Sequence, residues 1–163
     1  YDSFNILIIS ANQERKQVRV ALEAIATFKN ANPTVKTRLY LHSQQVGERD
    51  LRADEDELGL KGVIVYPEPY LMAHGGAPES DMVKVMNCAD VLINVCMEGF
   101  GYAVLQSQAC GVPAIVLSEG ASPELTIFGI ETNPLGKETL ANQMTQPKAN
   151  PIAIAAALQE IWD

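Results

Sequence analysis

The sequence has 163 residues, of which 47% are hydrophobic, and its formal net charge is −8 at pH 7. This length fits one domain, and the hydrophobic fraction is sufficient for a packed core, which argues against disorder. The negative charge argues against nucleic acid or an anionic membrane as the main partner, although backbone amides and one or two cations can still form a local phosphate site.

The cysteines and histidines do not suggest a disulfide framework or a metal site. Cys88, Cys96 and Cys110 are odd in number, share no CxxC spacing and lie within or beside apolar segments. We therefore expect reduced core residues in a cytoplasmic chain. His42 and His74 are isolated in the sequence, so no bound metal is expected.

No apolar run approaches the ~18 residues of a membrane span, and no signal peptide is visible. We therefore expect no transmembrane segment. The chain begins with Tyr1 rather than Met. We expect residues 1–163 to be a single domain of a longer protein.

The first half of the chain alternates short apolar runs with helical patterns. Residues 4–10 form a nearly continuous apolar run, typical of a strand buried on both faces of a parallel sheet. From 15 to 29 the apolar residues recur at steps of three and four, which predicts an amphipathic helix. Next we expect a strand at 37–41 and a surface helix at 48–60, whose acidic run 54–57 is solvated. A short strand at 63–66 and an irregular segment at 70–79 follow.

The second half continues the alternation. Ser80 is expected to cap a short helix, and Ser122 another that carries Pro123 at its first position. A helix at 102–109 ends before Gly111. The predicted strands are 90–95, 112–117 and, more weakly, 128–135, and a last helix runs from Pro151 to Trp162.

Strands that alternate with helices at this spacing predict an α/β fold: a doubly wound, mainly parallel sheet of about six strands with helices on both faces. Ligands of such sheets bind outside the carboxyl ends of the strands. Lys16 follows the first predicted strand and Glu98 follows the fourth. We therefore expect both residues at one edge of the sheet.

Several common ligand motifs of this fold are absent. The turn after the first strand reads SANQERK, with no GxGxxG for a dinucleotide, and the chain has no GxxxxGK[ST] loop. No serine lies in a GxSxG context, and the acidic residues of a phosphoacceptor domain are missing.

The segment NCADVLINVCMEGFGYAVLQSQACGVPA, residues 87–114, resembles the donor-binding half of the two-domain (GT-B) retaining glycosyltransferases of family 4. Their pattern there is A-A-D, then E-G-F-G-x-x-x-x-E, then A-x-G-x-P. Residues 119–124 resemble the family's G-G-x-P-E corner. The first strand and turn resemble its G-R-x-x-x-E-K-G segment, with Lys16 at the lysine. The resemblance covers residues 4–162 and implies the Rossmann-like half of a GT-B fold.

The resemblance implies a site for a nucleotide-diphosphate sugar. A helix that starts near Gly101 offers free N–H groups and a positive dipole end, and Lys16 supplies a point charge for the phosphates. Glu98, which we assign the catalytic role, would accept hydrogen bonds from the sugar hydroxyls. Eight helical residues rise roughly 12 Å, enough for position 106 to meet the ribose. The predicted substrate-binding residues are Arg15, Lys16, Gly99, Phe100, Gly101, Tyr102 and Gln106, although packing accounts better for Tyr102.

Two positions depart from the family's pattern. The second glutamate, which holds the ribose, is Gln106 here. The phosphate-binding arginine falls at Ala11 or Asn12, so that cation is missing. Arg15 would replace it only if its side chain turns toward the site.

The resemblance implies a C-terminal donor-binding domain of a retaining glycosyltransferase that needs no metal or other cofactor. Its partners would be the nucleotide sugar and an N-terminal acceptor-binding domain of the same longer chain. The isolated domain is expected to be inactive. Two alternatives remain open: a non-catalytic nucleotide- or sugar-binding module that has lost part of the donor site, and a sugar-nucleotide epimerase domain.

Overall fold

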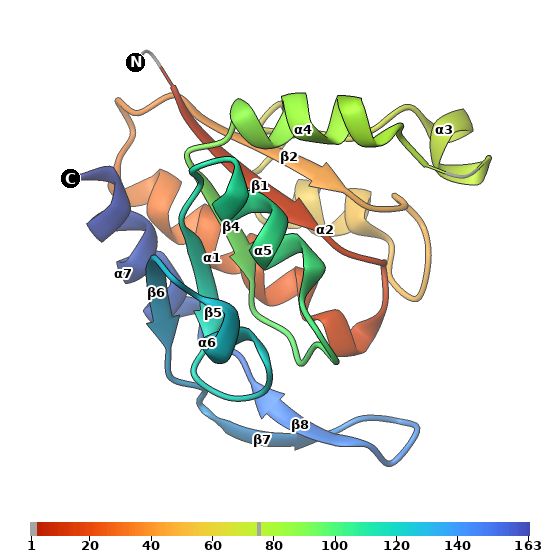
Figure 1. The fold of residues 1–163 in the computed structure, drawn as a ribbon, viewed down its shortest axis with the longest axis vertical. Coiled ribbons are helices and arrows are strands. Elements are labelled where there is room, and N and C mark those ends of the chain that lie inside the picture. The colour runs from red at the N-terminus through yellow and green to blue at the C-terminus, as the bar shows by residue number, and fades with distance from the viewer. Residues whose placement is uncertain (1–2, 75) are drawn as a thin grey trace.

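A six-stranded parallel sheet forms the centre of the computed structural model, which describes residues 3–74 and 76–163 (Figure 1). The strand order is β3-β2-β1-β4-β5-β6. The strands are β1 (Phe4–Ile9), β2 (Thr37–His42), β3 (Ile64–Val65), β4 (Val91–Asn94), β5 (Ala114–Leu117) and β6 (Gly129–Thr132). The expected α/β, doubly wound fold is confirmed.

Each face of the sheet has its own apolar cluster because successive strand residues point to opposite sides. Phe4, Ile6 and Ile8 of β1 join the larger cluster, which includes α1 and α7. Leu7 joins the smaller one with Met86 of α4 and Val104 of α5. The helices are α1 (Val18–Ala31), α2 (Leu51–Glu57), α3 (Pro69–Ala73), α4 (Glu79–Asn87), α5 (Tyr102–Ala109), α6 (Ser122–Leu125) and α7 (Pro151–Trp162).

The first helix begins later than the sequence predicts. Glu14–Lys16 form a separate 3-10 turn, η1, and Gln17 then adopts a left-handed backbone conformation with φ 53° before α1 starts at Val18. The apolar periodicity does not reveal this break, because the polar residues of η1 fit either arrangement. Lys16 therefore ends a turn and is not part of α1.

Helix caps account for the other shifted boundaries. The carboxylate of Asp50 accepts hydrogen bonds from the N–H groups of Arg52 and Ala53, so α2 begins at Leu51 rather than near residue 48. Ser80 is not a cap, because α4 begins one residue earlier, after Pro78. Ser122 is the first residue of α6 and not its cap.

The acidic run of α2 is not simply solvated. Asp54 is only 4% exposed, and its carboxylate accepts hydrogen bonds from Arg19 (2.7 Å) and Arg49 (2.9 Å). These cations hold the pKa of Asp54 below its ordinary value, although burial opposes the shift. Cys88 also departs from expectation because it is exposed, whereas Cys96 is buried as expected.

The weak strand expected at 128–135 is present as β6, but the sequence analysis missed an antiparallel hairpin after it. This hairpin joins β7 (Gly136–Thr139) to β8 (Thr145–Lys148). The segment 70–79, expected to be irregular, overlaps α3 and the start of α4, and Gly75 lies outside the described residues. Among the helices that the structure describes, none is long and apolar enough to cross a membrane.

Gly129→Ala should destabilise the protein far more than Gly136→Ala. Both glycines have positive φ, 146° and 141°, so both variants carry backbone strain of about 1–3 kcal/mol. A Cβ at Gly129 would lie 2.0 Å from the Ala114 carbonyl oxygen, whereas one at Gly136 would meet nothing within 4 Å. We expect urea denaturation to show an additional loss of about 3 kcal/mol at Gly129. Equal losses would contradict a clash between β5 and β6.

Candidate functional site

The carboxyl ends of β1 and β4 bring Lys16 and Glu98 together. These strands are parallel neighbours in the sheet, with Leu7 paired to Leu92. The Lys16 Nζ atom donates to Glu98 Oε1 and forms an ion pair with it. The two side chains are 9% and 25% exposed. A cation and a carboxylate that are 82 positions apart in the chain thus share one half-buried location.

A cleft of about 450 Å³ opens at this edge of the sheet. Its walls come from the end of β1, from η1, from the end of β2 and from the segment after β4. Met72 of α3 closes another side. The lining residues that can form polar contacts are Ser10, Arg15, Lys16, His42, Gln44 and Glu98.

Arg15 lines this cleft next to Lys16. It has no ion-pair partner among residues 3–74 and 76–163, so its guanidinium group is available to an anion. The left-handed turn at Gln17 ends η1 immediately after these two cations. Arg15 therefore borders the cleft next to Lys16, and it also lines a neighbouring pocket together with Gln13 and Glu48.

The strand end beneath Glu98 is tightly packed. Cys96 is buried, and its thiol lies 3.2 Å from Asn94 Oδ1 and 3.4 Å from Glu98 Oε1. Burial raises the pKa of Cys96 to about 12; Glu98 adds to this rise, while Lys16 and Arg15 oppose it. The thiol thus stays protonated and can donate to the Glu98 carboxylate.

The turn from Gly99 to Gly101 starts α5. Gly101 has φ 87°, a conformation that glycine adopts without strain. No side chain caps the helix, so the first N–H groups of α5 are open to a ligand. Phe100 is 49% exposed and its ring lies 4.7 Å from that of Tyr102. Tyr102 is 69% exposed, so its packing is against Phe100 at the surface and not within the core.

Gln106 lies outside the cleft. It is exposed on α5, four residues after Tyr102, and these two residues share one face of the helix. Gln106 is eight residues after Glu98, as in the family's pattern, but its side chain does not line the cleft around Glu98.

The structure separates the two positions where the family's arginine could fall. Ala11 is exposed and lines the cleft. Asn12 is buried, and its amide donates to the carbonyl oxygens of Gln44 (3.0 Å) and Arg49 (2.9 Å). Ala11 is therefore the position from which an added side chain would enter the cleft.

His42 is the main cleft residue that the sequence analysis missed as a site residue. It is the last residue of β2, and it pairs with Ile9 at the end of β1. The sequence position of His42 already indicates a site at the strand ends, because His42 directly follows the predicted strand 37–41. Lys16 and Glu98 likewise follow predicted strands. The absence of metal-ligand spacing around His42 says nothing about this role, because an anion site needs no second histidine.

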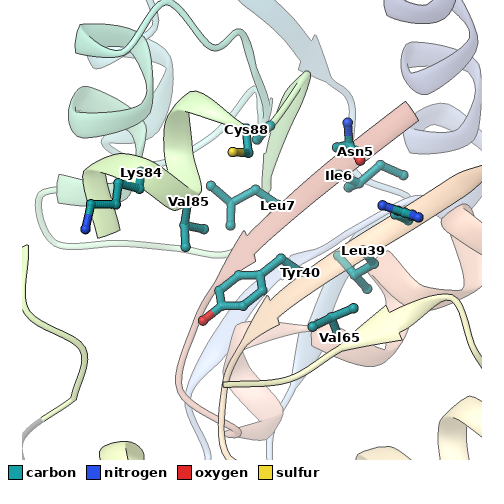
Figure 2. Close-up of a pocket in the computed structure, with 11 residues that line it drawn as sticks. Asn5, Ile6, Leu7, Leu39, Tyr40, Val65, Lys84, Val85 and Cys88 are labelled. Atoms are coloured by element: carbon teal, nitrogen blue, oxygen red, sulfur yellow. The ribbon is translucent and has the colours of Figure 1, made fainter. Parts of the chain in front are cut away.

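A second cavity, of about 290 Å³, is lined mainly by residues of β1, β2, β3 and α4 (Figure 2). Figure 2 shows Leu7, Tyr40 and Val65 on three neighbouring strands, with Val85 of α4 beside Leu7. No candidate site residue lines this cavity. Since its floor is apolar and the chemical groups gather at the strand ends, we take the cleft around Lys16 and Glu98 as the candidate site.

No metal centre accompanies this cleft: across residues 3–74 and 76–163, no three His, Cys, Asp or Glu side chains are grouped to hold an ion.

Comparison with known proteins identifies similar chains. A family model described as "Glycosyl transferases group 1" matches residues 3–163. A D-inositol 3-phosphate glycosyltransferase of Paenarthrobacter aurescens is 26% identical over 122 residues, which are 73% of this chain and 28% of that protein. The chain therefore spans less than a third of this relative.

Solved structures share the fold. The structure of HepE from Anabaena in complex with UDP-glucose superposes with a TM-score of 0.73 at 18% identity, over 99% of this chain and 40% of that one. The structure of the C-terminal domain of LpcC, a glycosyl transferase group 1 family protein from Francisella tularensis, gives a TM-score of 0.68 at 18% identity, over 98% of this chain and 75% of that one.

Asn12→Ala should lower the free energy of unfolding by about 2 kcal/mol, because the carbonyl groups of Gln44 and Arg49 would lose a buried donor. Asn133→Ala is the matched control, since the amide of Asn133 accepts only one exposed hydrogen bond, from Ser118. Thermal and urea unfolding of both variants would test this role. An Asn12→Ala variant as stable as the control would show that this amide does not hold the loop in place.

Proposed function

Because the chain belongs to the glycosyl transferases group 1 family, we propose that it is the donor-binding domain of a longer glycosyltransferase. Its ligand is a nucleotide-diphosphate sugar. The observation that carries this proposal is the convergence of Arg15, Lys16 and Glu98 on one cleft. The uncapped start of α5 follows Glu98 by four residues. The cations and helix N–H groups suit a diphosphate, and the carboxylate suits sugar hydroxyls.

Binding would exchange partners within the Lys16–Glu98 ion pair. The diphosphate takes the Lys16 ammonium group, and the sugar hydroxyls donate to the Glu98 carboxylate that Lys16 leaves. A carboxylate accepts two such bonds well. Glu98 therefore acts as the catalytic residue by holding the reacting sugar, while the backbone at Gly99, Phe100 and Gly101 approaches the donor closely.

Transfer in this proposal is retaining and metal-independent. Lys16, Arg15 and the positive end of α5 stabilise the negative charge that develops on the leaving diphosphate. The acceptor comes from an N-terminal domain of the same longer chain, and residues 1–163 alone are inactive. The UDP-glucose complex of HepE, whose fold this chain shares, supports the choice of ligand class.

The alternative of a non-catalytic binding module is favoured by two observations: Ala11 supplies no cation to the cleft, and Gln106 lies outside it. Calorimetric titration of the chain with UDP-glucose, GDP-mannose, ADP-glucose and the parent nucleoside diphosphates tests the shared premise. We expect saturable binding of at least one nucleotide sugar. The absence of binding across the panel would overturn the proposed function.

Lys16→Ala should weaken nucleoside diphosphate binding by about 1–3 kcal/mol, because a charged hydrogen-bond donor is lost and Glu98 is left without its cation. Lys61→Ala is the control, since the Lys61 side chain is 86% exposed and distant in sequence from the cleft. Calorimetry of both variants measures the difference. Equal affinities would place the diphosphate elsewhere.

Gln106→Glu tests whether the ribose of the nucleotide extends beyond the cleft to α5, since the Gln106 side chain does not line the cleft. If it does, nucleoside diphosphates should bind about 1 kcal/mol more tightly, because a carboxylate accepts hydrogen bonds from the two ribose hydroxyls more strongly than an amide does. Inorganic pyrophosphate, which lacks a ribose, should bind no more tightly than before. Parallel titrations with UDP and pyrophosphate compare the two effects. If both ligands respond alike, Gln106 is only a surface residue.

A further inference from the structure

The cleft is short of positive charge for a ligand that carries a diphosphate. Arg15 and Lys16 contribute two positive charges, and Glu98 removes one of them through its ion pair. The pattern that the chain resembles has an arginine at the position of Ala11 or Asn12, and of these two residues Ala11 lines the cleft. One net positive charge would therefore face the two negative charges of a diphosphate diester.

His42 is placed to make up this deficit. It ends β2 in register with Ile9, only two residues before Ala11, and its side chain lines the same cleft. Its Nδ1 atom is enclosed and has no hydrogen-bond partner among the residues that the structure describes. The imidazole therefore lines the cleft next to Ala11.

The surroundings of His42 disfavour the charged form of its imidazole. Burial lowers the pKa of His42 below its ordinary value of 6.5. Among the described residues, the charged groups that line the cleft with it are Arg15 and Lys16 from η1 and Glu98 from the segment after β4. On its own strand, the Tyr40 ring lies 6.1 Å from the imidazole.

We propose that His42 contacts the donor diphosphate and takes up a proton from solvent as the donor binds, and so supplies the cation that Ala11 cannot. This inference rests on the proposed function of the cleft. The anion stabilises the imidazolium form, since an opposite charge at close range favours the charged state. Proton uptake and binding are then linked.

The sign of this linkage determines the pH dependence. The free protein has a lowered His42 pKa, and the bound anion raises it. Affinity should therefore increase as pH falls through the pKa of the complex, and it should level off below the pKa of the free protein. A nucleotide sugar is the right ligand for the test, because its diphosphate diester has no proton that titrates near neutral pH.

The test measures the affinity of the tightest-binding ligand among UDP-glucose, GDP-mannose and ADP-glucose at about pH 5.5 and about pH 8. The unmodified chain should bind about tenfold more tightly at the lower pH. His42→Asn should abolish this difference. His74→Asn is the matched control: His74 is the chain's other histidine, is exposed and does not line the cleft, so it should keep the difference.

Calorimetry in two buffers of different ionisation enthalpy adds a readout that a merely structural role would not change. It should detect proton uptake on binding by the unmodified chain and by His74→Asn, but not by His42→Asn. His42→Gln serves as a second variant, and unfolding curves verify that each variant is folded. Proton uptake or pH dependence that persists in a folded His42 variant would overturn the inference, as would pH-independent binding by the unmodified chain.

A rescue experiment addresses the gap itself. Ala11→Arg combined with His42→Asn should restore tight binding without pH dependence, and failure to restore it would place the diphosphate away from this corner.

The experiments distinguish failure of the His42 inference from failure of the proposed function. If Lys16→Ala weakens binding and His42→Asn changes neither affinity nor proton uptake, only the role of His42 is lost. If no nucleotide sugar binds the unmodified chain at any pH, the proposed function falls with it.

Discussion

The side-chain amide of Gln17 is the interaction on which the arrangement of the cleft depends. Its Nε2 atom donates to the carbonyl oxygens of Val95 (3.3 Å) and Pro147 (3.0 Å), and its Oε1 atom accepts from the N–H of Ala149 (2.7 Å). One buried side chain thus joins the start of α1 to the end of β4 and to the end of the β7–β8 hairpin. Loss of any of these hydrogen bonds would leave a buried polar group without a partner, which lowers the free energy of unfolding. The left-handed backbone of Gln17 therefore has a structural cause.

A second buried amide holds the other end of the same turn. Asn12 binds the loop after β2, while Gln17 binds the end of β4, and the cations Arg15 and Lys16 lie between them. Nucleotide-binding turns of this fold class commonly depend on glycine, but here side-chain amides fix the backbone. Because both ends of the turn are fixed, the cations are held in place before any ligand arrives. In the proposed function this reduces the ordering that binding must impose.

Apolar periodicity and strand-end reasoning predicted the six-stranded sheet and the meeting of Lys16 with Glu98, because both depend on local pattern and on the geometry of parallel strands. The hairpin was missed since its strands, GKET and TQPK, are short, polar and interrupted by Pro147. The partners of Gln17 were out of reach because they lie 78 to 132 positions away. The burial of Asp54 was also not predictable from local pattern. One of its two cation partners, Arg19, comes from another helix, 35 positions away in the sequence.

The placement of Glu98 also bears on ligand choice within the proposed function. Glu98 lies four residues before the start of α5, so its carboxylate competes with a phosphate for the same positive helix end and for Lys16. A diphosphate that displaced Glu98 from Lys16 without offering a new donor would leave a half-buried carboxylate unpaired beside another anion. Sugar hydroxyls provide that donor. The Lys16–Glu98 ion pair therefore favours a nucleotide that still carries its sugar over the nucleoside diphosphate left after transfer. This order of affinities would promote release of the nucleoside diphosphate product.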